Sequence, residues 1–189
     1  MSKSNAAMST HRQDPRTPEG NAATQSRESS RSLRAESLAA RLEEGAALLA
    51  KFAEGLTEAE WNTRVRDGRT VGVIVHHVAS MYPIEMDAAR TIASGKPLVG
   101  VTWEVIADIN AQHAREHAAA GKADALALLR RNSQAAAAAL RQFTDAELDT
   151  AAPFSLSFDA PMTAQFALED HAVRHSWHHL WRIRAAVGR

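Results

Sequence analysis

Apolar residues recur at the spacing of an α-helix along most of this chain, and this pattern constrains the fold more than any other feature. In the first such stretch, Leu38, Leu42 and Phe52 fall on one face of a helix that begins near Leu33 and ends near Gly55. Similar patterns cover residues 70–94, 103–120, 124–143 and 163–187. Segments 103–120 and 124–143 form either two helices or one bent helix. The sequence therefore predicts an all-α fold, a bundle of four long helices with extra turns.

Capping residues and helix breakers mark the ends of these segments. Thr57 and Glu60 have the spacing of a capping box, and Thr70 and Thr102 are placed to cap the helices that follow them. Pro83 lies inside the second helix, where its ring predicts either a kink or an unpaired carbonyl. Residues 150–161 are rich in turn formers and are expected to form a loop that folds over one end of the bundle.

The first part of the chain differs from the rest in composition. Residues 1–33 are mostly Ser, Arg, Asn, Gln, Pro and Gly, with almost no large apolar side chain to offset the entropy of ordering. We expect a disordered N-terminal tail over 1–33, in which His11 is an incidental, solvated histidine. Residues 34–189 are long enough for one helical bundle domain and too short for two.

Composition limits the possible partners and the location of the protein. Lys plus Arg and Asp plus Glu both number 22, so no phosphate-neutralising surface is expected and nucleic acid is excluded as a partner. There is no apolar stretch of roughly 18 residues and no secretory leader pattern, which predicts a soluble, cytoplasmic protein with no membrane partner. The absence of cysteine leaves His and carboxylate as the candidate metal ligands.

Histidines are concentrated at two points of the chain. His171, His175, His178 and His179 lie within nine residues of one another in the last helix, and His76 and His77 are adjacent in the second. Side chains four residues apart lie on the same face of a helix, so His175 and His179 can point at a single ion. A metal needs further protein ligands, and we predict a site that joins these two helices.

Helical angles separate the candidates. At about 100° per residue, His77 lies roughly 90° from the centre of the apolar face of its helix, whereas His76 lies nearly opposite and faces water. In the last helix His179 lies closest to the apolar face, His175 lies somewhat further, and His178 lies almost opposite. The predicted metal ligands are therefore His77, His175 and His179.

His171 and the pair His113 and His117 are weaker candidates for metal ligands. His171 is separated from His179 by roughly 12 Å along the helix axis, too far to share an ion, and is expected to line the cavity or to support a ligand. His113 and His117 are four residues apart in the third helix and form the main rival site. No third ligand for this pair is suggested by the sequence, and a solvated polar face explains it equally well.

Two segments resemble the DinB/YfiT-like superfamily of metal-dependent helical-bundle proteins. They are Gly68–Val78 and His175–His179, and the resemblance covers about residues 35–187. It implies an up-down-down-up four-helix bundle, often a homodimer, in which one histidine of the second helix and two of the last bind a divalent metal. Those positions are His77, His175 and His179. Family members usually have Trp where this chain has Arg69, so the resemblance predicts the ligands but not the neighbouring pocket wall.

Three neutral imidazoles with an open position describe a catalytic metal site, because structural sites use four protein ligands. Such a site, holding Zn, Ni, Mn or Fe, either activates water for hydrolysis or binds a thiol as thiolate. The family resemblance favours the second route: transfer of a low-molecular-weight thiol, such as mycothiol or bacillithiol, to a small-molecule electrophile. A metal-dependent hydrolase, a non-catalytic metal-binding stress or interaction protein and a purely structural helical protein remain open.

The sequence does not single out a general base or a residue that orients the ligands. The side chains near the predicted ligands in sequence, any of which could orient an imidazole through its second nitrogen, are Glu85, Asp87, Glu169, Asp170 and His171. Among them we select His171 as the catalytic candidate, in contact with a ligand rather than with the metal. Asp170 is the second choice for this role.

Overall fold

The structure is a computed structural model that describes residues 32–189. The tail predicted for residues 1–33 lies outside the described residues, apart from Ser32 and Leu33. Ser32 caps the first described helix, because its side chain accepts a hydrogen bond from the backbone N–H of Ala35. Among the described helices, none is long and apolar enough to span a membrane.

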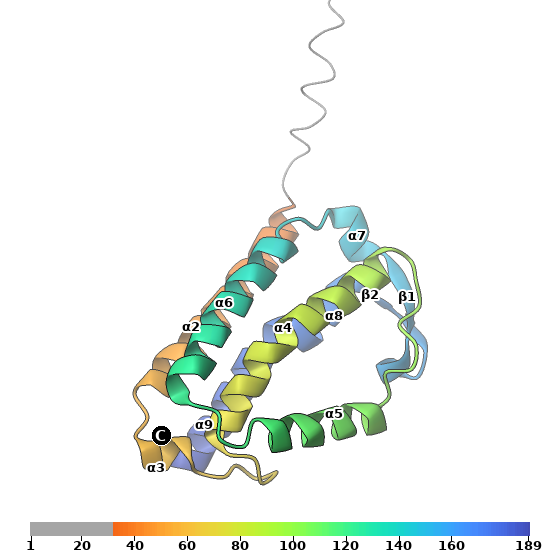
Figure 1. Cartoon of the computed structure of the whole chain (residues 1–189). Helices are drawn as coiled ribbons and strands as arrows, with labels where there is room; N and C mark the ends of the chain where they lie inside the picture. Colours follow the sequence, from red (N-terminus) through yellow and green to blue (C-terminus); the bar gives the residue numbers. More distant parts are fainter. Residues whose placement is uncertain (1–31) are drawn as a thin grey trace, which may run out of the picture. The chain divides into compact units, whose positions relative to one another are not determined.

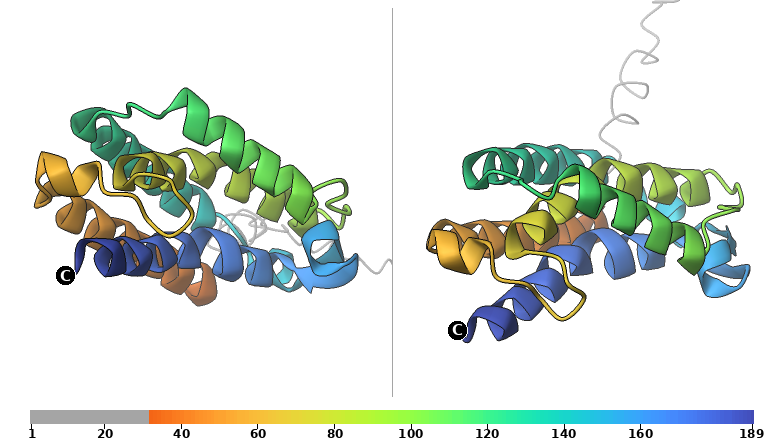
Figure 2. Two further views of the ribbon diagram at one scale, coloured as in Figure 1. Left: turned by 90° about the horizontal axis from the view of Figure 1, so that it is seen from below. Right: turned by 60° about the horizontal axis from the view of Figure 1, so that its bottom comes forward.

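Four long helices form the bundle: α2 (Leu33–Glu54), α4 (Val71–Ala93), α6 (Lys122–Leu140) and α9 (Arg174–Val187). Helices α2 and α9 run in one direction and α4 and α6 in the other, which is the predicted up-down-down-up order (Figure 1). Helix α2 packs against α6 and α9, and α4 packs against the same two helices from the opposite corner (Figure 2). The predicted all-α four-helix bundle is confirmed.

A separate helix, α5 (Trp103–Glu116), makes this topology possible. It carries the chain from the end of α4 back to the end at which α4 began, so that α6 starts there and runs parallel to α4 (Figure 1). Residues 103–120 and 124–143 therefore belong to two helices and not to one bent helix. Thr102 caps α5 as predicted, since its side chain accepts from the N–H of Val105.

Short elements complete the connections. Helix α3 (Glu58–Trp61) opens with the predicted capping box of Thr57 and Glu60, and α7 (Asp145–Asp149) opens with a second one, of Thr144 and Glu147. Thr70 caps α4, as the sequence predicted. These caps satisfy backbone N–H groups that have no partner inside a helix, which fixes where each helix begins.

The segment predicted to be a loop is a β-hairpin. Strands β1 (Ala151–Phe154) and β2 (Ala160–Thr163) pair antiparallel, and a 3₁₀ turn (Ser155–Ser157) lies between them. Ala152 and Phe154 of β1 are buried in a small apolar cluster with Ile92 near the end of α4. Alternate burial along β1 is the physical reason for a strand here, because successive side chains of a strand point to opposite sides. The hairpin does cover one end of α4, as predicted.

Pro83 leaves a carbonyl in α4 without its usual partner, and another helix supplies the missing donor. In a regular helix the carbonyl of Ala79 would accept the N–H of residue 83, which proline lacks. Here the side-chain amide of Asn132 in α6 donates to that carbonyl at 2.8 Å. Helix α4 is assigned as one helix through Pro83.

The last helical segment is interrupted where the histidines begin. A short helix, α8 (Ala164–Ala167), leads into a π-helical turn (Leu168–Val173) and then into α9. Because a π turn contains an extra residue, it shifts the later side chains by about 100° relative to an uninterrupted α-helix. Tyr82 of α4 is buried against the first turn of α9, where its hydroxyl lies 2.6 Å from that of Ser176.

Candidate metal centre

Imidazoles from α4 and α9 converge at the predicted site. His77 belongs to the first half of α4, and His175 and His179 lie in successive turns of α9. One nitrogen from each ring lies within 4.8 Å of the others, and Nε2 of His77 is 3.3 Å from Nε2 of His175. Two nitrogens bound tetrahedrally to one ion at about 2.0 Å would be about 3.3 Å apart, so this pair already has the spacing of metal ligands.

Burial favours the neutral form of the two innermost rings. His77 and His179 are each only 5% exposed, and this burial, helped by the nearby imidazole of His175, holds the pKa of both well below its usual range. A neutral imidazole has a free lone pair, which is the form that binds a metal. The two rings are therefore ready to act as ligands without first losing a proton.

A carboxylate supports the third ring. Oε1 of Glu85 lies 2.6 Å from Nδ1 of His175, although the N–H of the ring does not point straight at it. A carboxylate behind Nδ1 favours the tautomer that leaves Nε2 free, and this arrangement is common behind metal-binding histidines. Of the five side chains that the sequence offered for this role, Glu85 is the one in contact with a ring of the site.

The atoms that the site offers also fit a metal. Nitrogens of His77, His175 and His179 lie within 4.8 Å of one another, and a carboxylate oxygen of Glu85 lies beside His175. Three nitrogen donors and an adjacent carboxylate are a donor set that a divalent transition metal accepts.

The three rings face a cavity of about 550 Å³. Its apolar wall includes Met81 and Ile84 of α4, Trp103 and Ile106 of α5, and Leu156 in the turn of the hairpin. This volume lies within the range of small-molecule sites, which are mostly apolar with a few polar groups.

Arginines line the polar side of the cavity. Arg69, Arg174 and Arg182 all border it. Two of them are held in place by Asp67, whose Oδ2 accepts from Arg69 at 2.8 Å and from Arg182 at 2.7 Å. In the part of the chain that the structure describes, Nη1 of Arg69 is buried and has no partner. Arg69 thus places a positive charge in the wall of the cavity.

His171 lies in the wall of the same cavity, which is one of the two positions expected for it, and it is outside the group formed by His77, His175 and His179. Its ring meets the ring of Phe154 edge to face, with centroids 5.5 Å apart, and its Nε2 is 3.7 Å from Asp170. Burial lowers the pKa of His171, so it too favours the neutral form. Its part in catalysis remains a prediction.

The expectation that His76 faces water is wrong. Helix α5 packs over that side of α4, and the ring of His76 is half-buried between His113 and His117. The sequence showed the pair on α5 and showed His76, but nothing in the periodicity of either helix indicated that they meet. His178, in contrast, is exposed at the edge of the cavity, as predicted, and lies outside the group formed by His77, His175 and His179.

Solved structures similar to this chain include the following two. The first is YfiT from Bacillus subtilis, a probable metal-dependent hydrolase with an unusual four-helix bundle topology. It is 25% identical, with a TM-score of 0.65, over 82% of this chain and 86% of YfiT. The second is the colibactin self-resistance protein ClbS in complex with a double-stranded DNA, at 17% identity and a TM-score of 0.63 over 81% and 94% of the two chains. A search of curated proteins found no match.

The likeness to ClbS corrects one sequence-based prediction. Balanced charge was taken to exclude a nucleic-acid partner, yet a protein of this fold has been seen bound to duplex DNA, so that exclusion is wrong. Net charge is a sum over the whole chain, whereas binding depends on where the charges lie. In this protein three arginines border one cavity although the total charge is zero.

The family assignment comes from a match over most of the chain. A family model described as the DinB superfamily matches residues 41–183, which include α4, α5, α6 and the histidines of α9. This agrees with the bundle topology and with the resemblance seen in the two histidine segments. The chain belongs to the DinB superfamily.

Proposed function

We propose that this protein is a divalent-metal-dependent enzyme that transfers a low-molecular-weight thiol to a small electrophile. His77, His175 and His179 would hold the metal. The observation that carries the proposal is the convergence of three imidazoles from two helices on one side of a 550 Å³ cavity. Three protein ligands leave a coordination position for a substrate group, as in catalytic sites.

A bound divalent cation would lower the pKa of a thiol or a water molecule beside it, and so supply a nucleophile at neutral pH. Side chains of the protein would orient the ligands and transfer protons. Glu85 would hold the proton at Nδ1 of His175 and so keep Nε2 of that ring directed at the site. His171, in the cavity wall, would exchange a proton with the substrate.

The lining of the cavity contains both apolar and charged side chains, which fits a reaction between two different molecules. Met81, Ile84 and Trp103 are apolar and suit an apolar electrophile. Arg69 and Arg182 offer guanidinium groups, which bind carboxylates in a fixed geometry. Low-molecular-weight thiols commonly carry polar or carboxylate groups, so these arginines suit the thiol.

The composition is consistent with a thiol supplied from outside. The chain has no cysteine, so it cannot provide a thiol nucleophile of its own. A cosubstrate thiol would enter through the open cavity and place its sulfur beside His77, His175 and His179.

Hydrolysis is the second candidate, and the likeness to YfiT favours it. YfiT is a probable metal-dependent hydrolase and is 25% identical to this chain over the part of the two chains that aligns. The same three histidines would serve this reaction, with water in place of the thiol. The two candidates share their ligands and differ in the nucleophile.

The nucleophile can be identified with the cobalt-substituted protein. Untagged protein loaded with Co²⁺ would be mixed with a low-molecular-weight thiol, and the thiolate-to-cobalt charge-transfer band would be followed. We expect the band to appear in the wild type and in His178→Ala and to be absent in His179→Ala. Thiol consumption with a model electrophile would then be compared with ester and amide hydrolysis. Hydrolysis without thiol dependence would favour the second candidate, and metal binding without either activity would indicate a non-catalytic protein.

A further inference from the structure

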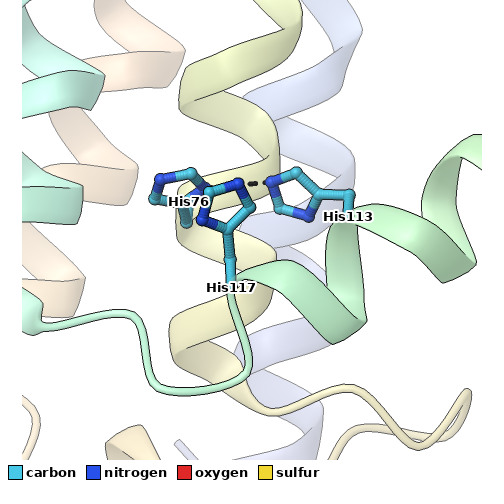
Figure 3. Close-up of side chains that lie close together, drawn as sticks. All are labelled: His76, His113 and His117. Carbon is cyan, nitrogen blue, oxygen red and sulfur yellow. Dashed lines mark hydrogen bonds between the residues drawn. The ribbon is translucent and has the colours of Figure 1, made fainter.

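We propose that His76, His113 and His117 form a second divalent-cation site, separate from the one above, and that a cation there fastens helix α5 over the cavity. One nitrogen from each of these rings lies within 4.8 Å of the other two. Figure 3 shows the three imidazoles gathered between α4, which carries His76, and the last turn of α5.

The rings are packed closely enough to share an ion. Nδ1 of His76 is 2.9 Å from Nε2 of His113, and the rings of His76 and His117 are stacked with centroids 3.9 Å apart (Figure 3). The rings of His113 and His117 are 4.6 Å apart. A modest adjustment of the His76–His113 pair, to about 3.3 Å, would give the separation of two nitrogens on one tetrahedral ion.

The surroundings of the rings suit a metal. His113 is 8% exposed, and burial disfavours the charged form of an imidazole. A neutral imidazole has the free lone pair that binds a metal. Two imidazoles this close can also share a single hydrogen bond without any metal, and the experiment below separates these two states.

The two histidine clusters share no ligand. His76 and His77 are consecutive in α4, and their side chains diverge because a helix turns about 100° per residue. His77 joins α9, and His76 joins α5. The nearest rings of the two clusters, His77 and His113, have centroids 5.4 Å apart. Either cluster can therefore be altered while the ligands of the other are kept.

Apart from the histidine cluster, few buried contacts hold helix α5 on the bundle. His113 is the only buried residue between Trp103 and Glu116, and Trp103, Val105 and Ile109 are 57%, 40% and 42% exposed. A helix held by so little apolar contact opens easily. The cluster at its C-terminal end joins it to α4, the most deeply buried helix near the site.

Fastening α5 would affect the cavity directly. Trp103, Ile106, Ile109 and Asn110 of α5 all border the cavity in which His77, His175 and His179 lie. A cation at the second cluster would keep this wall closed, and its loss would allow α5 to move away. The second site is thus a structural one that shapes the first.

Zn²⁺ titration of the metal-free, untagged full chain tests the stoichiometry. We expect two equivalents to bind to the wild type and to His178→Ala, and one to bind to His117→Ala and to His117→Gln. The variant His179→Ala should also bind one equivalent, which His117→Ala added in the same chain should remove. One equivalent lost in His117→Ala but kept in His179→Ala would support this site and count against the proposed function.

Hydrogen exchange provides a readout that does not depend on activity. Zn²⁺ should slow amide exchange in residues 103–116 of the wild type and of His179→Ala, and should leave this segment unchanged in His117→Ala. Circular dichroism of each variant would establish that it is folded. The proposal is overturned if His117→Ala and His117→Gln bind as much Zn²⁺ as the wild type, or if bound Zn²⁺ leaves exchange in α5 unchanged.

Discussion

His76 and His77 are adjacent in the chain, yet their imidazoles belong to different clusters on two sides of α4. The ring of His77 lies 5.0 Å from that of His175, whereas the ring of His76 lies 3.9 Å from that of His117. One turn of one helix therefore supplies ligands to two groups of histidines. Because the divergence follows from helix geometry, each group can be tested by removing one of two neighbouring side chains.

The first prediction concerns His76 and His77. His77→Ala should no longer bind metal at the cluster with His175 and His179. In this variant Zn²⁺ should still slow hydrogen exchange in α5. His76→Ala should show the opposite behaviour, because it keeps all ligands of the first cluster. Zn²⁺ titration and hydrogen exchange on both variants check this. Identical behaviour of the two variants would contradict the division into two sites.

Glu85 should tune the first site without being a ligand. Its carboxylate lies 2.6 Å from Nδ1 of His175, and removing such a partner typically weakens metal binding by about 10- to 100-fold. We expect a loss of this size in Glu85→Gln, measured by competition with a chelator. Asp87→Asn is the matched control, because Asp87 lies on the same helix and is exposed. An unchanged metal affinity in Glu85→Gln would show that Glu85 does not support His175 as a ligand.

Asn132 should stabilise α4 at Pro83. Its amide donates to the carbonyl of Ala79, so Asn132→Ala should lower the free energy of unfolding by about 1–3 kcal/mol by leaving that carbonyl unpaired. In a Pro83→Ala background the backbone N–H of residue 83 is restored and can bond to Ala79. The cost of Asn132→Ala should therefore be smaller there. Denaturant unfolding of the four proteins measures this coupling, and equal costs in both backgrounds would argue against it.

Gly72 allows a close approach of Trp61 to the start of α4. A Cβ atom at position 72 would lie 2.5 Å from Nε1 and 2.7 Å from Cε2 of the Trp61 ring. The ring is buried, and its N–H donates to the carbonyl of Ala120 at 3.0 Å. Gly72→Ala should therefore destabilise the protein by about 1–3 kcal/mol through overpacking.

A glycine with free space around it provides the comparison for Gly72. At Gly55 the nearest atom to an added Cβ is a backbone oxygen 3.6 Å away, which is an ordinary contact. Thermal unfolding should show a clearly smaller change for Gly55→Ala than for Gly72→Ala. The reverse order would mean that the Trp61 contact does not limit position 72.

The features that the sequence predicted well depend on neighbouring residues. Caps such as Thr70 and Thr102 act within one helical turn, so their positions in the chain are enough to locate them. The facing of His77 and of His179 follows from the apolar residues of their own helices. The up-down-down-up order came from the family resemblance, because helical periodicity alone does not say how helices are arranged.

The features that were missed depend on contacts between distant segments. His76 was assigned to solvent because only the residues of α4 entered the estimate, and α5 covers that side. Glu85 could not be chosen among five candidates, because the choice depends on how α4 and α9 are placed side by side. The π turn before α9 and the hairpin of β1 and β2 likewise result from packing that local periodicity does not report.

Elemental analysis of two variants at adjacent positions tests the central claim most directly. His178 and His179 follow one another in α9, but only His179 belongs to the cluster with His77 and His175. Untagged His178→Ala and His179→Ala would be purified side by side and their metal content per chain measured. The account predicts one equivalent less of divalent metal in His179→Ala. Equal metal content in the two variants would contradict it.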